Sequence, residues 1–119
     1  MNWEKYEQRK KDRYSRFVHT LDECGTFLLH ESNETIASNI FEEFDIDVRC
    51  NLCDENLSIF LDEYWIDETI QRDSVRLREL FCTLEKNHPE LWNSQAVRTA
   101  PEWLEILQLS DSVKLMLFT

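Results

Sequence analysis

Apolar residues recur three or four positions apart along most of this chain, a spacing that places side chains on one face of an α-helix. Residues 2–23 are predicted to form the first helix, with the apolar stripe Tyr14, Phe17, Val18 and Leu21. Asn2 is its predicted N-cap, because an asparagine side chain accepts a backbone hydrogen bond there. Gly25 is its predicted stop, since glycine is common just after a helix.

The helical spacing returns in several later segments. Their starts are predicted, in chain order, at Ser32 or Asn33, Asp54, Asp67 or Asp73, Pro89 and Thr99. The helix that follows Asp67 or Asp73 has the clearest repeat and is predicted to end near Asn87. Thr99 and Glu102 have the spacing of a capping box, in which each side chain accepts from the backbone of the other.

Residues 44–52 are ambiguous. Apolar and polar residues alternate there without a break, which is the pattern of a half-buried β-strand. No glycine-containing hairpin turn joins this stretch to another such run, and this favours a helix instead. If it is a strand, residues 26–29 or 113–118 are the nearest candidates to pair with it.

Composition supports one globular unit. The 119 residues include one glycine and two prolines, and 42% of the chain is apolar, so it holds no linker and enough apolar mass for one core. We therefore predict an all-α fold, a single-domain helical bundle of five or six helices spanning residues 1–119. A minor β element near residues 44–52 is the alternative.

The charge is distributed unevenly. The formal net charge is −11, yet residues 22–68 hold fourteen acids against one base, Arg49, for a net charge of −13. Residues 1–21 are basic, with a net charge of +3. The negative electrostatic field of residues 22–68 disfavours direct binding of nucleic acid and favours a positively charged partner. The basic helix predicted at residues 2–23 can neutralise part of this charge within the molecule.

Two clusters of acids within this segment form the candidate partner-binding surface. The second cluster encloses two adjacent aromatic residues, which can supply buried contact area while the carboxylates guide a basic protein into place. The alternative is that one or both rings belong to the core. The candidate residues are Glu42, Glu43, Asp45, Asp47, Asp54, Glu55, Asp62, Glu63, Tyr64, Trp65, Asp67 and Glu68.

The sequence offers little chemistry, so we expect no catalytic residues, no metal ion and no cofactor. Cys50 and Cys53 have the spacing of half a zinc site, but no second pair accompanies them. Cys50 lies on the apolar side of the alternating stretch, so buried, free structural thiols are expected. The three histidines stand in no catalytic or metal-binding motif.

An acidic helical chain with aromatics in its acidic stretch resembles bacterial immunity proteins, which bind and block nuclease toxins. The helical immunity proteins of DNase colicins pair an acidic helix with two adjacent aromatics, here matched by Tyr64 and Trp65, although no glycine or proline follows the pair. The general profile is closer to immunity proteins of contact-dependent growth inhibition systems. The resemblance implies inhibition of a cognate toxin domain through its basic, phosphate-binding cleft.

Two other functions remain open from the residues. One is mimicry of nucleic acid against a DNA- or RNA-binding enzyme, as in anti-restriction or anti-CRISPR proteins. The other is a non-catalytic regulatory subunit. The longest apolar runs are too short to cross a bilayer and the first residues are charged, so we expect a cytoplasmic protein without a membrane partner.

Overall fold

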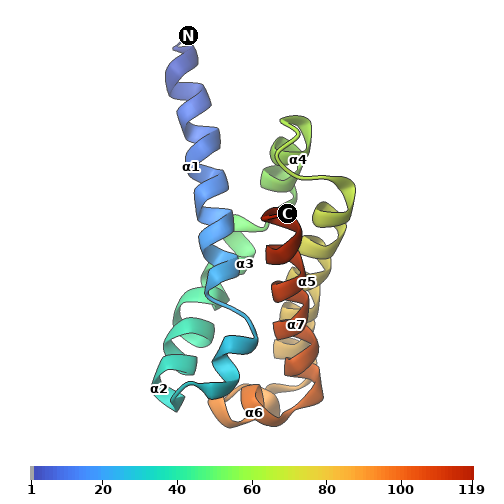
Figure 1. The fold of residues 1–119 in the computed structure, drawn as a ribbon. Helices are drawn as coiled ribbons and strands as arrows, with labels where there is room; N and C mark the ends of the chain where they lie inside the picture. Colours follow the sequence, from blue (N-terminus) through green and yellow to red (C-terminus); the bar gives the residue numbers. More distant parts are fainter. Residues whose placement is uncertain (1) are drawn as a thin grey trace.

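The computed structural model describes residues 2–119, and its described part is all-α, as predicted, with no strand. Figure 1 shows the long helices running along the molecule, with shorter helices around them. In chain order the elements are α1 (Trp3–Asp22), η1 (Thr26–His30), α2 (Asn33–Ile36), η2 (Ala37–Phe44), α3 (Asp45–Asn51), α4 (Asp54–Asp62), α5 (Glu68–Asn87), η3 (Pro89–Leu91), α6 (Ser94–Thr99) and α7 (Pro101–Leu117).

The arrangement is centred on α7. It packs along α5 and against α1, while α4 lies between α1 and α5, and α6 crosses the lower end of the molecule (Figure 1). The first turns of α1 project beyond the neighbouring helices at the upper end. No helix among residues 2–119 is long and apolar enough to cross a membrane.

One cluster of buried residues connects all the long helices. Trp103 of α7 is fully buried, and its ring packs 5.8 Å from that of Phe81 and 5.4 Å from that of Trp92. Its indole nitrogen donates a 2.7 Å hydrogen bond to the carbonyl of Leu91, which removes the cost of burying a polar group. Aromatic packing therefore fixes η3 and α7 against α5.

Three predicted helix starts are confirmed by their caps. Asn2, Ser32 and Asp67 each accept a hydrogen bond from the backbone nitrogen three residues later. The capping box at Thr99 and Glu102 is wrong. Thr99 ends α6 and donates to the Gln95 carbonyl instead, because Pro101 occupies the first position of α7 and makes Ala100 the cap.

Gly25 does not stop α1 as predicted. The helix already ends at Asp22, and the backbone of Gly25 is extended, with a φ of 169°, not left-handed. Space explains the glycine instead, since a Cβ here would lie 2.5 Å from an oxygen of Asp111 and 2.8 Å from the Lys114 nitrogen. Both groups are held in place, by Thr26 and by the Cys24 carbonyl respectively.

The β alternative for residues 44–52 is wrong. Residues 45–51 form α3. Val48 within it and the flanking residues Phe44 and Leu52 are fully buried. These residues lie four positions apart, so the alternating stretch also contains a helical stripe. Ile46, which a strand would place on the same face as Phe44 and Val48, is 62% exposed.

A π-helical segment explains how this stripe stays in the core. Five fully buried residues are spaced strictly four apart, namely Ile36, Ile40, Phe44, Val48 and Leu52. In an α-helix of 3.6 residues per turn, such a stripe drifts by about 40° at every step. The segment η2 is π-helical, and its wider turns rotate the apolar stripe in the opposite direction. As a result α2, η2 and α3 form one continuous helix whose stripe faces the core throughout.

Two substitutions test the helical assignment of residues 44–52. Val48→Ala should lower the free energy of unfolding by about 2 kcal/mol, because it leaves a cavity in the core. Ile46→Ala should change it by less than about 0.5 kcal/mol, because that side chain is exposed. Urea denaturation followed by circular dichroism measures both. Equal losses for the two variants would contradict the helix and support a strand.

Candidate functional site

The turn between α4 and α5 presents one aromatic side chain to solvent in an unusual backbone conformation. Tyr64 has a φ of 61°, and its side chain is 93% exposed. The Tyr64 nitrogen donates to the Leu61 carbonyl at 3.0 Å, and the Trp65 nitrogen donates to the Phe60 carbonyl at 2.9 Å. These two bonds define a Schellman motif, whose left-handed position is usually glycine.

Trp65 anchors this turn from the other side. Its ring packs 6.2 Å from the ring of Phe60, the hydrophobic contact that accompanies a Schellman motif, and 5.4 Å from the ring of Tyr14 on α1. Adjacent aromatics thus have opposite roles. Trp65 is half-buried and ties the turn to α1, whereas Tyr64 points away from the core.

The left-handed conformation of Tyr64 costs stability that the tyrosine side chain itself does not offset. A left-handed residue other than glycine costs about 1 to 2 kcal/mol, and the exposed tyrosine ring makes no core contact in compensation. Strained residues that persist in folded proteins cluster at functional sites. Tyr64 is therefore the strongest single candidate for a contact with a partner.

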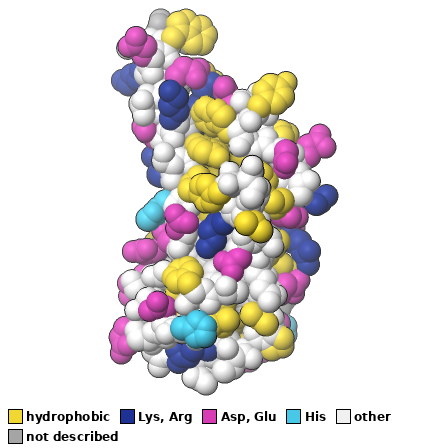
Figure 2. Space-filling view, viewed as in Figure 1, with side chains coloured by type: hydrophobic (Ala, Val, Ile, Leu, Met, Phe, Trp, Pro, Cys, Tyr) yellow, Lys and Arg dark blue, Asp and Glu magenta, His cyan; other side chains and the backbone are white. Residues whose placement is uncertain are grey.

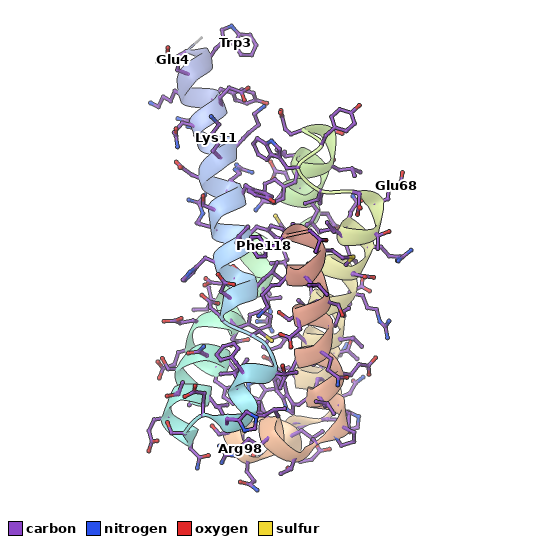
Figure 3. All side chains as sticks on the ribbon, viewed as in Figure 1. Trp3, Glu4, Lys11, Glu68, Arg98 and Phe118 are labelled. Carbon is purple, nitrogen blue, oxygen red and sulfur yellow. The ribbon has the colours of Figure 1, made fainter. Side chains whose placement is uncertain are left out.

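A groove of about 550 Å³ lies beside Tyr64. Its walls come from the α4–α5 turn, the start of α5 and the end of α7, and they include Trp65, Ile66, Ile70, Met116 and Leu117. Phe118, 69% exposed, lies near the centre of Figure 3 at the end of α7. Figure 2 shows apolar side chains gathered in a band on this face. We call Tyr64 and this groove the Tyr64 surface.

Three of the predicted acids border the Tyr64 surface. Asp67 and Glu68 line the groove, and Asp62 ends α4 two residues before Tyr64. All three are exposed, and Glu68 points outward in Figure 3. None of them forms an ion pair with another residue in the described part of the chain. The charges of Asp62 and Glu68 are thus directed at solvent, while Asp67 also accepts the cap hydrogen bond from the Ile70 nitrogen.

Other predicted acids are neutralised within the molecule. Arg13 of α1 lies 3.6 Å from Glu55, and Lys10 bonds Glu63. The basic first helix therefore offsets part of the acidic segment, as the sequence suggested. The remaining pairs join Asp54 to Arg78 at 2.9 Å and Asp45 to Arg49.

Lys10 is the most enclosed of these bases, with a side chain that is 10% exposed. The hydrogen bonds to Glu63 and Glu7 raise its pKa well above the ordinary value. Its ammonium also lies 4.7 Å from the centre of the Tyr6 ring. This contact holds the start of the α4–α5 turn against the projecting part of α1.

The first acidic cluster lies elsewhere. Glu42 and Glu43 are on η2 and Asp47 is on α3, in the lower half of Figure 1, whereas the α4–α5 turn is near the upper end. The structure therefore does not join the two predicted clusters into one surface. Glu43 and Asp47 instead approach Glu23, a buried acid outside the predicted set. The pKa of Glu23 is raised to about 9, mainly by burial and further by the nearby carboxylates of Asp47 and Glu43.

Sequence reasoning missed two parts of this picture. Met116 and Leu117 complete the groove, whereas the sequence pattern assigned residues 113–118 a place only as a conditional strand partner of residues 44–52. His19 and Glu23 were treated as unrelated, although their spacing of four places them on one helix face, with 3.4 Å between Nε2 and a carboxylate oxygen. That spacing was the available signal.

The cysteines are free, as expected, but they are not all buried. Cys24 is fully buried, and burial raises its pKa to about 12. Cys50 is exposed, which corrects the prediction, because α3 turns this position away from Val48. Cys53 is half-buried and lines a cavity with Cys82, beside Arg49 and Arg78.

Thiol alkylation should follow this order of exposure. At about pH 8, iodoacetamide should modify Cys50 first and leave Cys24 unmodified until the protein unfolds, because both burial and a raised pKa suppress its thiolate. Peptide mass spectrometry over time measures each site. The Cys50→Ser variant should lose the fast phase. Fast modification of Cys24 in the native protein would contradict its burial.

Comparison of the chain with protein-family models, with curated proteins and with solved structures finds no match.

Proposed function

We propose that this protein is a non-catalytic inhibitor that binds a basic protein through the Tyr64 surface, as an immunity protein binds a nuclease toxin. The observation that carries this proposal is the strained, 93% exposed Tyr64 at the rim of an open groove with both apolar and acidic walls. Large aromatic residues that become buried on binding are typical energetic centres of protein interfaces. The groove can accept an apolar side chain of the partner.

The surrounding charge supports a basic partner. Asp62, Asp67 and Glu68 stand next to Tyr64 without internal counterions among residues 2–119. Such carboxylates accelerate the encounter with a positive surface and fix its orientation, while the aromatic contact supplies most of the affinity. A nuclease is a suitable target class, because it must present a basic cleft to hold phosphates.

The ion pairs within the molecule favour this function over mimicry of nucleic acid. A mimic needs carboxylates spaced along an extended surface in place of phosphates. Here Asp54, Glu55 and Glu63 are engaged by Arg78, Arg13 and Lys10. The free acids near the Tyr64 surface form a short border around an apolar centre instead, which is the anatomy of a protein–protein interface.

Co-expression tests the proposed function directly. The protein is expressed with the product of the adjacent gene, and the complex is purified at low salt. We expect co-purification and neutralisation of that product's toxicity. A neighbouring toxin that stays lethal, with no complex recovered, would refute the immunity function.

Tyr64→Gly separates binding from folding. Glycine relieves the left-handed strain, so the free energy of unfolding should rise by about 1 kcal/mol. Loss of the ring should weaken partner binding by about 2 kcal/mol or more. Denaturation and calorimetric titration with the co-purified partner measure the two effects.

Ile46→Ala is the matched control, because Ile46 is an exposed apolar residue on α3, outside the Tyr64 surface. Its binding should equal that of the wild type. If Tyr64→Gly also binds as the wild type does, Tyr64 is not an anchor.

Charge reversal tests electrostatic guidance. Asp62→Lys with Glu68→Lys should slow association with the basic partner, and the effect should grow as ionic strength falls. Glu31→Lys with Glu34→Lys is the control of equal charge change, since both are exposed acids outside the Tyr64 surface. Stopped-flow association rates at several salt concentrations provide the measurement. Equal slowing in the control would assign the effect to net charge instead of this surface.

A further inference from the structure

Two helices bring one histidine and three carboxylates together on the side of the molecule where α1 packs against α3. His19 and Glu23 are four residues apart at the end of α1, and Glu43 and Asp47 are four apart across the junction of η2 and α3. Ligand atoms of His19, Glu23 and Glu43 all lie within 4.8 Å of one another. Asp47 also reaches Glu23.

The state of Glu23 distinguishes this group from an ordinary acidic patch. The Glu23 side chain is only 4% exposed. One of its oxygens faces the His19 imidazole, while the other, Oε2, is buried and has no hydrogen-bond partner. A buried carboxyl oxygen next to further carboxylates is costly unless a proton or a cation satisfies it, and a cation can contact this oxygen and offset the repulsion among all the carboxylates.

The backbone holds Glu23 in this position. The Asn39 side chain donates a 3.2 Å hydrogen bond to the Glu23 carbonyl and so fixes the end of α1 against η2. The π-helical form of η2 contributes to the same junction, and such segments occur often at functional sites. His19, by contrast, is 71% exposed, so the group remains open to solvent on one side.

We propose that His19, Glu23 and Glu43 form a binding site for a divalent transition-metal ion, best matched by Zn²⁺, with Asp47 beside it. One imidazole nitrogen with carboxylate oxygens suits zinc and related ions, whereas Ca²⁺ and Mg²⁺ prefer oxygen ligands alone. The ion would link the end of α1 to the helix of residues 33–51. The site is separate from the Tyr64 surface and independent of the proposed partner.

Calorimetric titration of the full chain tests the site. After treatment with a chelator and its removal, the protein is titrated with ZnCl₂ and, separately, with MgCl₂. We expect one Zn²⁺ per chain and at least tenfold weaker binding of Mg²⁺. His19→Ala and Glu43→Gln should each weaken Zn²⁺ binding at least tenfold. Binding of Zn²⁺ by His19→Ala with wild-type affinity would overturn the proposal.

Matched controls exclude general effects of histidine and charge. His30→Ala and Glu42→Gln change exposed residues outside the group and should keep the affinity within about twofold of the wild type. His19 and Glu43 are exposed, so their variants should fold, and equal melting temperatures in chelator verify this. Losses in the controls as large as in the site variants would refute a specific site.

The cysteine thiols are the main competing ligands for Zn²⁺, so the double variant Cys50→Ser with Cys53→Ser tests whether they bind the metal instead. This variant should bind Zn²⁺ as the wild type does, and loss of binding would assign the metal to the cysteines. Nuclear magnetic resonance of the imidazole nitrogens gives a second readout. Zn²⁺ should shift the signals of His19 and leave those of His30 unchanged, and the reverse pattern would overturn the assignment.

Discussion

The packing of Trp65 and Phe60 on Tyr14 is the interaction on which the candidate binding surface depends. It joins α1 to α4, and the backbone bond from Trp65 to the Phe60 carbonyl closes α4 in the same place. With its neighbour fixed in this way, Tyr64 must take a left-handed conformation and point into solvent. The energy gained by burying Trp65 sustains the strain at Tyr64, and this coupling makes the exposed ring a fixed feature of the surface.

Electrostatics follows from the same arrangement. Lys10 and Arg13 lie on the face of α1 next to α4, where they neutralise Glu63 and Glu55. Among the residues that the structure describes, the acids left without an ion pair near the turn are those around Tyr64. The folded molecule therefore converts a broadly acidic segment into a smaller charged border, which suits recognition of one basic partner better than mimicry of a phosphate backbone.

The helix of residues 33–51 shows how one unusual element can support two features. Its π-helical segment keeps a strict four-residue apolar stripe in the core and, on another face, carries Glu43 toward Glu23. A straight α-helix would turn part of the stripe away from the core. Core packing thus places acidic side chains next to a buried carboxylate.

The sequence alone determined the long helices, three N-caps and the internal neutralisation, because these depend on side chains a few residues apart or on net charge. It determined the all-α class at residues 44–52 only incompletely, since Phe44, Val48 and Leu52 satisfy both a helical and a strand pattern. Tertiary structure decided that conflict by burying these three and exposing Ile46. It also decided that Tyr64 is exposed and Trp65 half-buried, although local sequence cannot tell these adjacent aromatics apart. The burial of Glu23 was decided in the same way, because exposure depends on which distant helix covers a residue.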